Sequence, residues 1–396
     1  MGLELKARRC PVCNAPVEVE PGATSVTCRY CEHTLDVRPV EPRAGATPGG
    51  QRSRGPRSTA DASGASSSPA GASVAPPSRV SRRLGLSVAL GVFLPLVSGV
   101  AALRSFTAGQ LASQSVPAVC RPNGTVRLVN VEHTGAGTLV EASLNCKVFI
   151  EKSKLVGDVI VKGAANVEVT IDDSVVEGKL AVIDASHNTR IKVRKGSRLL
   201  GSGVLIHGEA NPVVQVEDAY LEGRELVRLG SNGELTALRS TLVAQHRVVA
   251  AGPVARVTFV ESDARSEDIA LEAGANLTLT LDHAALRGVG GGVESGPNAR
   301  LRLSREAELS SDHGAFRTDS NLEALVEESR IVGKEEGLHA EANARITLRP
   351  GGTIEGETAV LLGVNAVVES TGGALVGGRT ALRAGINAEV DLRRAD

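Results

Sequence analysis

The most regular feature of the chain is a pattern of apolar and polar positions that repeats about every 22 residues from residue 123 onward. Each repeat has a marker position, and the residues three and five places after it are apolar, with Ser370 the one exception, while the residue between them is polar in most repeats. The markers are Asn123, Asn145, Asn166, Asn188, Asn211, Asn232, Val254, Asn276, Asn298, Asn321, Asn343, Asn365 and Asn387. Because alternation with period two is typical of a half-buried strand, each repeat is predicted to hold one short β-strand.

The rest of each repeat predicts a corner and a second strand. A small residue, such as Ser153 or Gly196, stands eight places after the marker, and an apolar residue follows shortly after it. Small residues let the chain turn sharply. If the repeats stack once per coil, residues three places after the marker form one buried column that includes Val126, Val148, Val169, Ile191 and Val214. The polar residues between the apolar ones are expected to stay exposed, and Val254 is expected to occupy the asparagine column at its corner.

A period near 22 with strands joined by tight corners resembles the right-handed parallel β-helix of the pectin-lyase-like superfamily. The resemblance covers residues 123–396 and rests on the period and the asparagine markers, not on a catalytic motif. It implies an all-β solenoid of about twelve coils in which stacked asparagine side chains hydrogen-bond along the stack. A leucine-rich repeat has a similar period, but its Leu-x-x-Leu-x-Leu pattern and helical segments are not evident in this sequence.

Charge supports the same frame. Seven places after the marker, the residues of six successive repeats alternate in sign: Lys152, Asp173, Lys195, Asp218, Arg239 and Glu261. Stacked coils would place each carboxylate between cations. Since the alternation cancels the field that a charged ligand would feel, the stripe is interpreted as a solvated ladder that fixes the register and not as a binding stripe.

The segments before the repeats have different compositions. Residues 38–83 are dominated by Pro, Gly, Ser, Ala and Arg, so they are predicted to be a disordered linker. Residues 84–103 contain no charged side chain and are long enough to cross a bilayer as one helix. Residues 104–122 are the expected entry segment or cap of the β-helix. We expect a single-pass protein with its N-terminus in the cytoplasm and its β-helix in the periplasm or outside the cell.

The N-terminal residues 1–37 carry the strongest chemical motif. Two C-x-x-C pairs, Cys10 with Cys13 and Cys28 with Cys31, are separated by fourteen residues. Four thiolates on two such turns are typical of a closed, structural Zn²⁺ site, and the segment resembles the zinc ribbons. Reduced thiols suit a reducing compartment, which favours the cytoplasmic placement of this end.

Two further cysteines, Cys120 and Cys146, lie near the same corner of neighbouring coils in this frame. In an oxidising compartment they are expected to form a disulfide that fastens the entry segment to the first coils.

Overall charge and composition exclude some functions. The formal net charge is -1 and residues 1–40 hold equal numbers of basic and acidic side chains, so no nucleic-acid partner is expected. The chain has only seven aromatic side chains, namely five Phe and two Tyr, and those of the repeats fall at different phases. No aromatic platform for a sugar is therefore predicted.

Fragments reminiscent of polygalacturonase signatures occur at Asp172-Asp173, at residues 190–192 and at His207-Gly208. Their order along the chain differs from that family, and Asp172 and His207 lie 13 positions of 22 apart around the coil. Two groups on opposite sides of the coil cannot flank one glycosidic bond. No catalytic residue is assigned.

The sequence therefore favours a membrane-anchored, non-enzymatic scaffold, adhesin or envelope-binding protein. Its rod would carry a glycan or other envelope ligand, and its zinc ribbon would contact a protein. A carbohydrate-active enzyme on the same β-helix, a polysaccharide lyase or hydrolase, is the alternative, and a transmembrane ligand sensor is a third. Fold alone does not decide among these functions.

Overall fold

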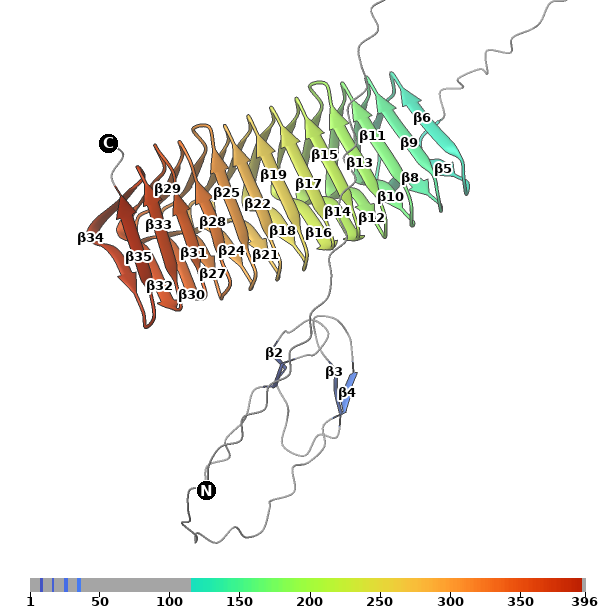
Figure 1. The fold of residues 1–396 in the computed structure, drawn as a ribbon. Coiled ribbons are helices and arrows are strands. Elements are labelled where there is room, and N and C mark those ends of the chain that lie inside the picture. The colour runs from blue at the N-terminus through green and yellow to red at the C-terminus, as the bar shows by residue number, and fades with distance from the viewer. Residues whose placement is uncertain (1–7, 10–15, 18–24, 28–33, 37–114, 394–396) are drawn as a thin grey trace, which may run out of the picture. The chain divides into compact units, whose positions relative to one another are not determined.

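The computed structural model of the chain describes residues 8–9, 16–17, 25–27, 34–36 and 115–393. The chain divides into two compact units, Met1–Phe106 and Thr107–Asp396. In the first unit the described residues form two antiparallel pairs, β1 (Arg8–Arg9) with β2 (Pro16–Val17) and β3 (Ser25–Thr27) with β4 (Thr34–Asp36). The second unit is an all-β parallel solenoid, drawn from cyan to red in Figure 1.

The first wall of the solenoid is a parallel sheet with one short strand from each turn. These strands are β6 (Thr125–Val129), β9 (Lys147–Glu151), β11 (Glu168–Asp172), β13 (Arg190–Arg194), β15 (Val213–Glu217), β17 (Glu234–Leu238), β19 (Arg256–Val260), β22 (Thr278–Asp282), β25 (Arg300–Ser304), β28 (Glu323–Val326), β31 (Arg345–Leu348), β33 (Val367–Thr371) and β35 (Glu389–Arg393). The predicted strand of every repeat is confirmed. The sheet has 13 strands, one more than the twelve coils expected, because the last marker, Asn387, also precedes a strand.

The remaining walls are built by a second set of parallel strands. They are β5 (Ala118–Cys120), β7 (Glu132–Thr134), β8 (Thr138–Ala142), β10 (Lys154–Gly163), β12 (Val175–Ala185), β14 (Arg198–Ala210), β16 (Tyr220–Ser231), β18 (Thr241–Ala251), β20 (Asp263–Ser266), β21 (Ile269–Ala273), β23 (Ala285–Gly288), β24 (Gly291–Ser295), β26 (Glu308–Ser311), β27 (Gly314–Thr318), β29 (Arg330–Gly333), β30 (Glu336–Ala342), β32 (Thr353–Val364) and β34 (Ala374–Ala384). Some turns contribute one long strand and others two short ones, as when β18 pairs with both β20 and β21.

The interior is a column of aliphatic side chains, as the repeat predicts. Val126 is 1% exposed, and Val148, Val169, Ile191 and Val214 are fully buried. The expectation that all outward residues stay exposed is wrong at Thr170, which is 5% exposed. Thr170 pairs with Phe149 on one side and Lys192 on the other, and these longer side chains shield the short threonine from solvent.

Two of the corners depend on residues with a left-handed backbone. All thirteen markers have positive φ, from 51° at Asn343 to 66° at Asn298, and Val254 takes the same conformation at 62°. Asparagine adopts the left-handed backbone conformation more readily than most residues other than glycine, which explains why it recurs at the markers. The residues of the charge ladder, such as Lys152 and Asp218, also have positive φ and form the second corner.

A third corner separates the two halves of the second strand set. In-register positions on successive turns carry small residues: Gly157, Gly178, Gly201, Gly223, Ala244, Ser266, Gly288, Ser311, Gly333, Gly356 and Gly377. The chain folds back tightly at these positions. A Cβ atom on Gly178 would lie 2.2 Å from the Ala181 carbonyl oxygen, and one on Gly333 would lie 1.9 Å from that of Glu336.

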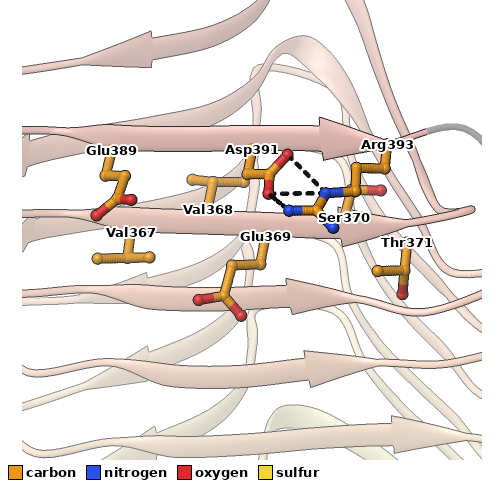
Figure 2. Close-up of a pocket in the computed structure, with 8 residues that line it drawn as sticks. All are labelled: Val367, Val368, Glu369, Ser370, Thr371, Glu389, Asp391 and Arg393. Carbon is orange, nitrogen blue, oxygen red and sulfur yellow. Dashed lines mark hydrogen bonds and ion pairs between the residues drawn. The ribbon is translucent and has the colours of Figure 1, made fainter.

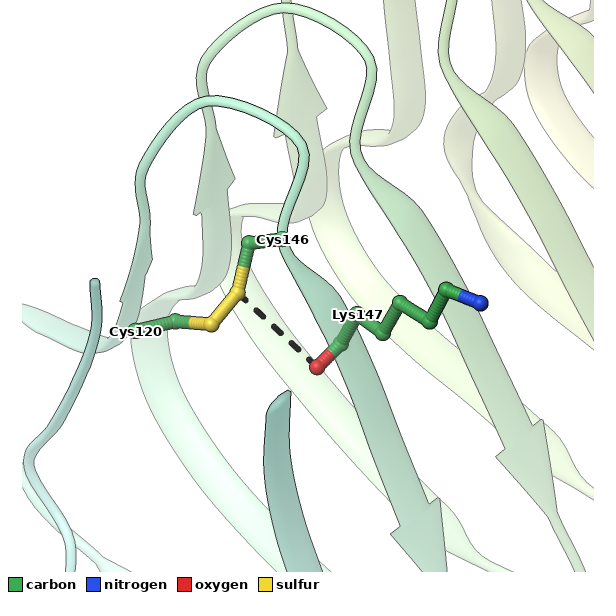
Figure 3. The surroundings of a disulfide bond; sticks show 3 residues. All are labelled: Cys120, Cys146 and Lys147. Carbon is green, nitrogen blue, oxygen red and sulfur yellow. Dashed lines mark hydrogen bonds between the residues drawn. A yellow bond between two sulfur atoms is a disulfide. The ribbon is translucent and has the colours of Figure 1, made fainter. Parts of the chain in front are cut away.

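The predicted disulfide between Cys120 and Cys146 is confirmed, with 6.3 Å between the two Cα atoms (Figure 3). Both cysteines are buried, at 2% and 0% exposure. Ala118, on the same strand as Cys120, belongs to the hydrophobic core of the solenoid, and Val116 packs against that core. The entry strand is thus bound to the first turns by a covalent bond and by apolar contacts.

Candidate lateral binding surface

The marker side chains form a hydrogen-bonded ladder on the outside of the first corner. In each step the amide nitrogen of one asparagine donates to the amide oxygen of the asparagine one turn before it, at 2.8 to 3.2 Å. The ladder runs from Asn123 to Asn232 and again from Asn276 to Asn387. Val254 separates the two runs because its side chain has no amide. The predicted stacking of asparagines is confirmed.

Two shallow cavities lie along this ladder, one on each side of Val254, and we call them together the asparagine groove. The first has a volume of about 400 Å³ and is lined by Asn145, Lys147, Asn166, Val167, Glu168, Asn188, Thr189, Arg190, Asn211 and Val213. The second has a volume of about 280 Å³ and is lined by Asn276, Thr278, Asn298, Ala299, Arg300, Asn321 and Glu323. In both, the lining consists of the asparagine markers and residues one or two places after them, so the same kind of surface occurs twice.

The groove offers neutral hydrogen-bonding groups. An asparagine amide has two N–H donors and an oxygen with two lone pairs. Inside each run the ladder uses one of each, so such an amide keeps one donor and one acceptor for a ligand. Most charged residues of the lining are paired: Lys147 Nζ lies 3.8 Å from Glu168 Oε2, and Arg300 Nε lies 3.2 Å from Glu323 Oε2. Arg190 has no ion pair among the described residues. The arrangement therefore suits a ligand rich in hydroxyl or amide groups more than a strongly charged one.

The second corner has an internal serine ladder. The Ser153 amide nitrogen donates to Ser174 Oγ at 3.1 Å, and the Ser174 hydroxyl donates to the Asp172 carbonyl oxygen at 2.7 Å. Similar bonds recur at Ser197, Ser240, Ser262 and Ser329. These buried hydroxyls satisfy backbone groups that the turn removes from the sheet. The sequence shows small residues there, but it does not show that they bond between coils.

Ion pairs cover the same corner on the outside. The Arg239 guanidinium contacts Asp218 at 2.7 Å and Glu217 at 2.9 Å, and its hydrogen bonds hold the pKa of Asp218 below the usual value. Arg305 bonds to Asp282 and lowers the pKa of that carboxyl in the same way. Because these charges are paired between adjacent turns, this stripe contributes to register and presents little net charge to a ligand.

The polygalacturonase-like fragments are not brought together. Asp172 lies at the end of β11 in the first sheet, where it is bonded to Arg194 and Lys195, each at 3.0 Å. His207 lies on β14 in the other strand set, and its Nδ1 is 2.8 Å from Asp184. Asp172 and His207 thus lie on strands of different walls, which agrees with their predicted positions on different sides of the coil.

Several histidines of the solenoid lie close to carboxylates. His246 is 2.9 Å from Asp268, His313 is 3.0 Å from Glu335 and His187 is 3.1 Å from Glu209. These pairs are at different turns and are exposed. Within the described residues, no group of three or more His, Cys, Asp or Glu side chains is placed to hold a metal ion.

The predicted zinc ligands Cys10, Cys13, Cys28 and Cys31 lie outside the described residues, and so does the predicted membrane helix at residues 84–103. In the part of the chain that the structure describes, no helix is long and apolar enough to cross a membrane.

Comparison with known proteins gives no assignment. No family model, no curated protein and no solved structure matches the chain. The resemblance is therefore one of architecture alone.

Proposed function

We propose that the chain is a membrane-anchored, non-enzymatic adhesin or scaffold whose solenoid binds an extended, neutral polymer of the cell envelope along the asparagine groove. The ligand class is a glycan strand, because its hydroxyl groups match amide donors and acceptors that recur once per turn. The observation that carries the proposal is the repetition of the same groove, with the same kinds of residue at the same phases, on both sides of Val254.

The geometry supports lateral binding over catalysis. A linear polymer can make the same contact at successive turns, so that many weak hydrogen bonds add up to useful affinity. A hydrolase needs two carboxylates placed on either side of one bond, and the carboxylates of this groove, such as Glu168 and Glu323, pair with cations of neighbouring turns. Their role in the groove is therefore to balance charge.

The N-terminal part completes the proposal. The two antiparallel strand pairs each bracket one C-x-x-C in the sequence: Cys10 and Cys13 lie between β1 and β2, and Cys28 and Cys31 lie between β3 and β4. Such an arrangement is typical of a zinc ribbon, and we propose that these thiolates hold one structural Zn²⁺ and that the ribbon contacts a protein. The disulfide supports an oxidising location for the solenoid, which agrees with an anchor at residues 84–103 and a cytoplasmic N-terminus.

The proposal is tested with the full chain in mild detergent on an array of linear and branched glycans. We expect linear neutral glycans to be retained. Replacing Asn188 with glycine keeps the left-handed corner without strain and removes only the amide, so the Asn188→Gly and Asn298→Gly variants should each weaken binding about tenfold.

The matched control is Asn130→Gly, since Asn130 has the same positive φ of 56° but lies at the second corner, outside the groove. It should bind like the unmodified chain. If no linear polymer is retained, or if the three glycine variants bind equally well, the groove is not the binding surface.

A further inference from the structure

The two ends of the solenoid differ in how their core side chains are covered. In the first turn Val126 and Leu128 are 1% and 0% exposed. In the last turn the residues of the same two columns, Val390 and Leu392, are 43% and 55% exposed. The outer edge of β35 pairs with no strand among the described residues, so backbone donors and acceptors are also open there.

A shallow cavity of about 310 Å³ lies at the same end, lined by Val367, Val368, Glu369, Ser370, Thr371, Glu389, Asp391 and Arg393 (Figure 2). An exposed strand edge combined with exposed core side chains is a template for pairing with another chain.

The charged residues of β35 indicate which kind of strand could pair with it. On the outward face of this strand, Glu389 and Asp391 precede Arg393, and Arg393 is hydrogen-bonded to Asp391 at 2.7 Å (Figure 2). A second β35 could pair antiparallel with the first. Because side chains alternate between the two faces of a strand, only every second register keeps Val390 and Leu392 of both copies on the core side. In one such register Arg393 of each strand faces Glu389 of the other, but the two Asp391 side chains then face each other; in the next register Arg393 of each strand faces Asp391 of the other, and no like charges among residues 389, 391 and 393 are opposed. The strand is therefore complementary to itself.

We infer that the C-terminal end of the solenoid, formed by β33 to β35, is a docking surface for a second copy of this chain. The two solenoids meet end to end through antiparallel β35 strands, with the inner columns of both joined into one core. A two-fold arrangement uses the same surface on both copies and is closed. Head-to-tail growth would need an open first turn, but the core of that turn is already covered and Ala118 and Cys120 belong to it.

This inference is independent of the groove, because none of the groove residues lies in β35. The experiment is sedimentation velocity of the full chain in density-matched detergent over a concentration series. The unmodified chain should be a dimer. Two charge-reversed chains, Arg393→Glu alone and Glu389→Arg combined with Asp391→Arg, should each dissociate at a concentration at least about tenfold higher, because like charges then face each other.

Mixing the two charge-reversed chains in equal amounts should restore a dimer, since every outward charge then meets its opposite. A control variant, Arg256→Glu, changes an exposed charge in the middle of the solenoid and should sediment like the unmodified chain. Circular dichroism confirms that each variant is folded. A chain that stays monomeric at its highest soluble concentration, a series of larger assemblies, or dimers that are equally strong in all variants would overturn the inference.

Discussion

At the scale of single residues, the corner conformation explains both the asparagine repeat and its exception. A left-handed backbone costs little for asparagine, whereas for a β-branched residue it costs about 1–3 kcal/mol. Val254 has a φ of 62° and is 50% exposed, so burial of its side chain offsets little of this conformational cost. It also breaks the hydrogen-bond ladder between Asn232 and Asn276.

Replacing Val254 with asparagine should therefore raise the free energy of unfolding by about 1–3 kcal/mol, through relief of backbone strain and two new amide hydrogen bonds. Chemical denaturation of the full chain measures the change. The Val254→Gly variant separates the two causes, because it relieves the strain but adds no amide. If the glycine variant gained as much as the asparagine variant, the ladder would contribute nothing to stability.

The sequence predicted some residue roles and not others. The asparagine markers and the aliphatic columns could be read directly, because one type of side chain recurs at one phase. The left-handed backbone of the second corner could not be predicted, since residues as different as Lys152, Asp218 and His283 occupy it and share only their backbone conformation. The charges of this corner predicted ion pairs, and Arg239 does form one. The shared backbone conformation does not favour one residue type, so the sequence does not predict it.

At the scale of elements, most strands of the first sheet alternate between core and surface. In β15, Val214 is fully buried while Gln215, the next residue, is exposed. An aspartate at residue 214 would enter a core with no polar partner, so Val214→Asp should cost at least about 4 kcal/mol and unfold or split the solenoid.

The matched variant Gln215→Asp should change stability by no more than about 0.5 kcal/mol, because residue 215 faces solvent. Thermal melts followed by circular dichroism compare the two variants. Equal losses of stability would contradict the assignment of inside and outside positions along the strand.

Ion pairs between strands give the solenoid a defined response to acid. The pKa of Asp282 is lowered, first by its hydrogen bond with Arg305 and also by the charge of that guanidinium. A carboxyl whose pKa is lower in the folded state stabilises the fold above its unfolded pKa of about 3.9, and this stabilisation is lost as the pH falls through the folded value.

Asp282→Asn should consequently lower the melting temperature more at pH 7 than at pH 2, because the carboxyl of the unmodified chain loses its charge as the pH falls through its folded pKa. Melts at a series of pH values test this, and 1 M salt should reduce the difference at pH 7 because the pair is near the surface. A difference that is the same at both pH values would show that Asp282 acts through its shape and not through its charge.

The second half of each repeat was predicted less well than the first. The distance between markers varies between 21 and 23 residues, so positions after the second corner cannot be aligned between repeats by counting from the marker. In the folded chain these positions are realigned by the glycine-rich third corner, where backbone atoms approach too closely for a Cβ atom. The groove could have been found with the first-half frame, because its charged residues Lys147, Glu168 and Arg190 stand at one phase, two places after the marker.

At the scale of the whole molecule, the two units have different sources of stability. The solenoid has 13 turns, buries a continuous aliphatic column in all but the last of them, and adds one disulfide at its start. Residues 1–37 are too few to bury a comparable core, so a metal site would have to supply much of their folding free energy. The stability of one unit should then respond to metal while that of the other should not.

Purified full-length chain should accordingly contain one equivalent of zinc, held by Cys10, Cys13, Cys28 and Cys31. The Cys28→Ser variant should lose this zinc, because a closed tetrahedral site cannot spare one thiolate, whereas Cys120→Ser, which changes only the disulfide, should keep it. Elemental analysis gives the stoichiometry.

A chelator should remove the metal and abolish the contribution of the N-terminal unit to the circular dichroism spectrum. The melting temperature of the solenoid should not shift, since the disulfide and the aliphatic core need no metal. Less than half an equivalent of zinc, or equal zinc in both serine variants, would show that these cysteines are not its ligands.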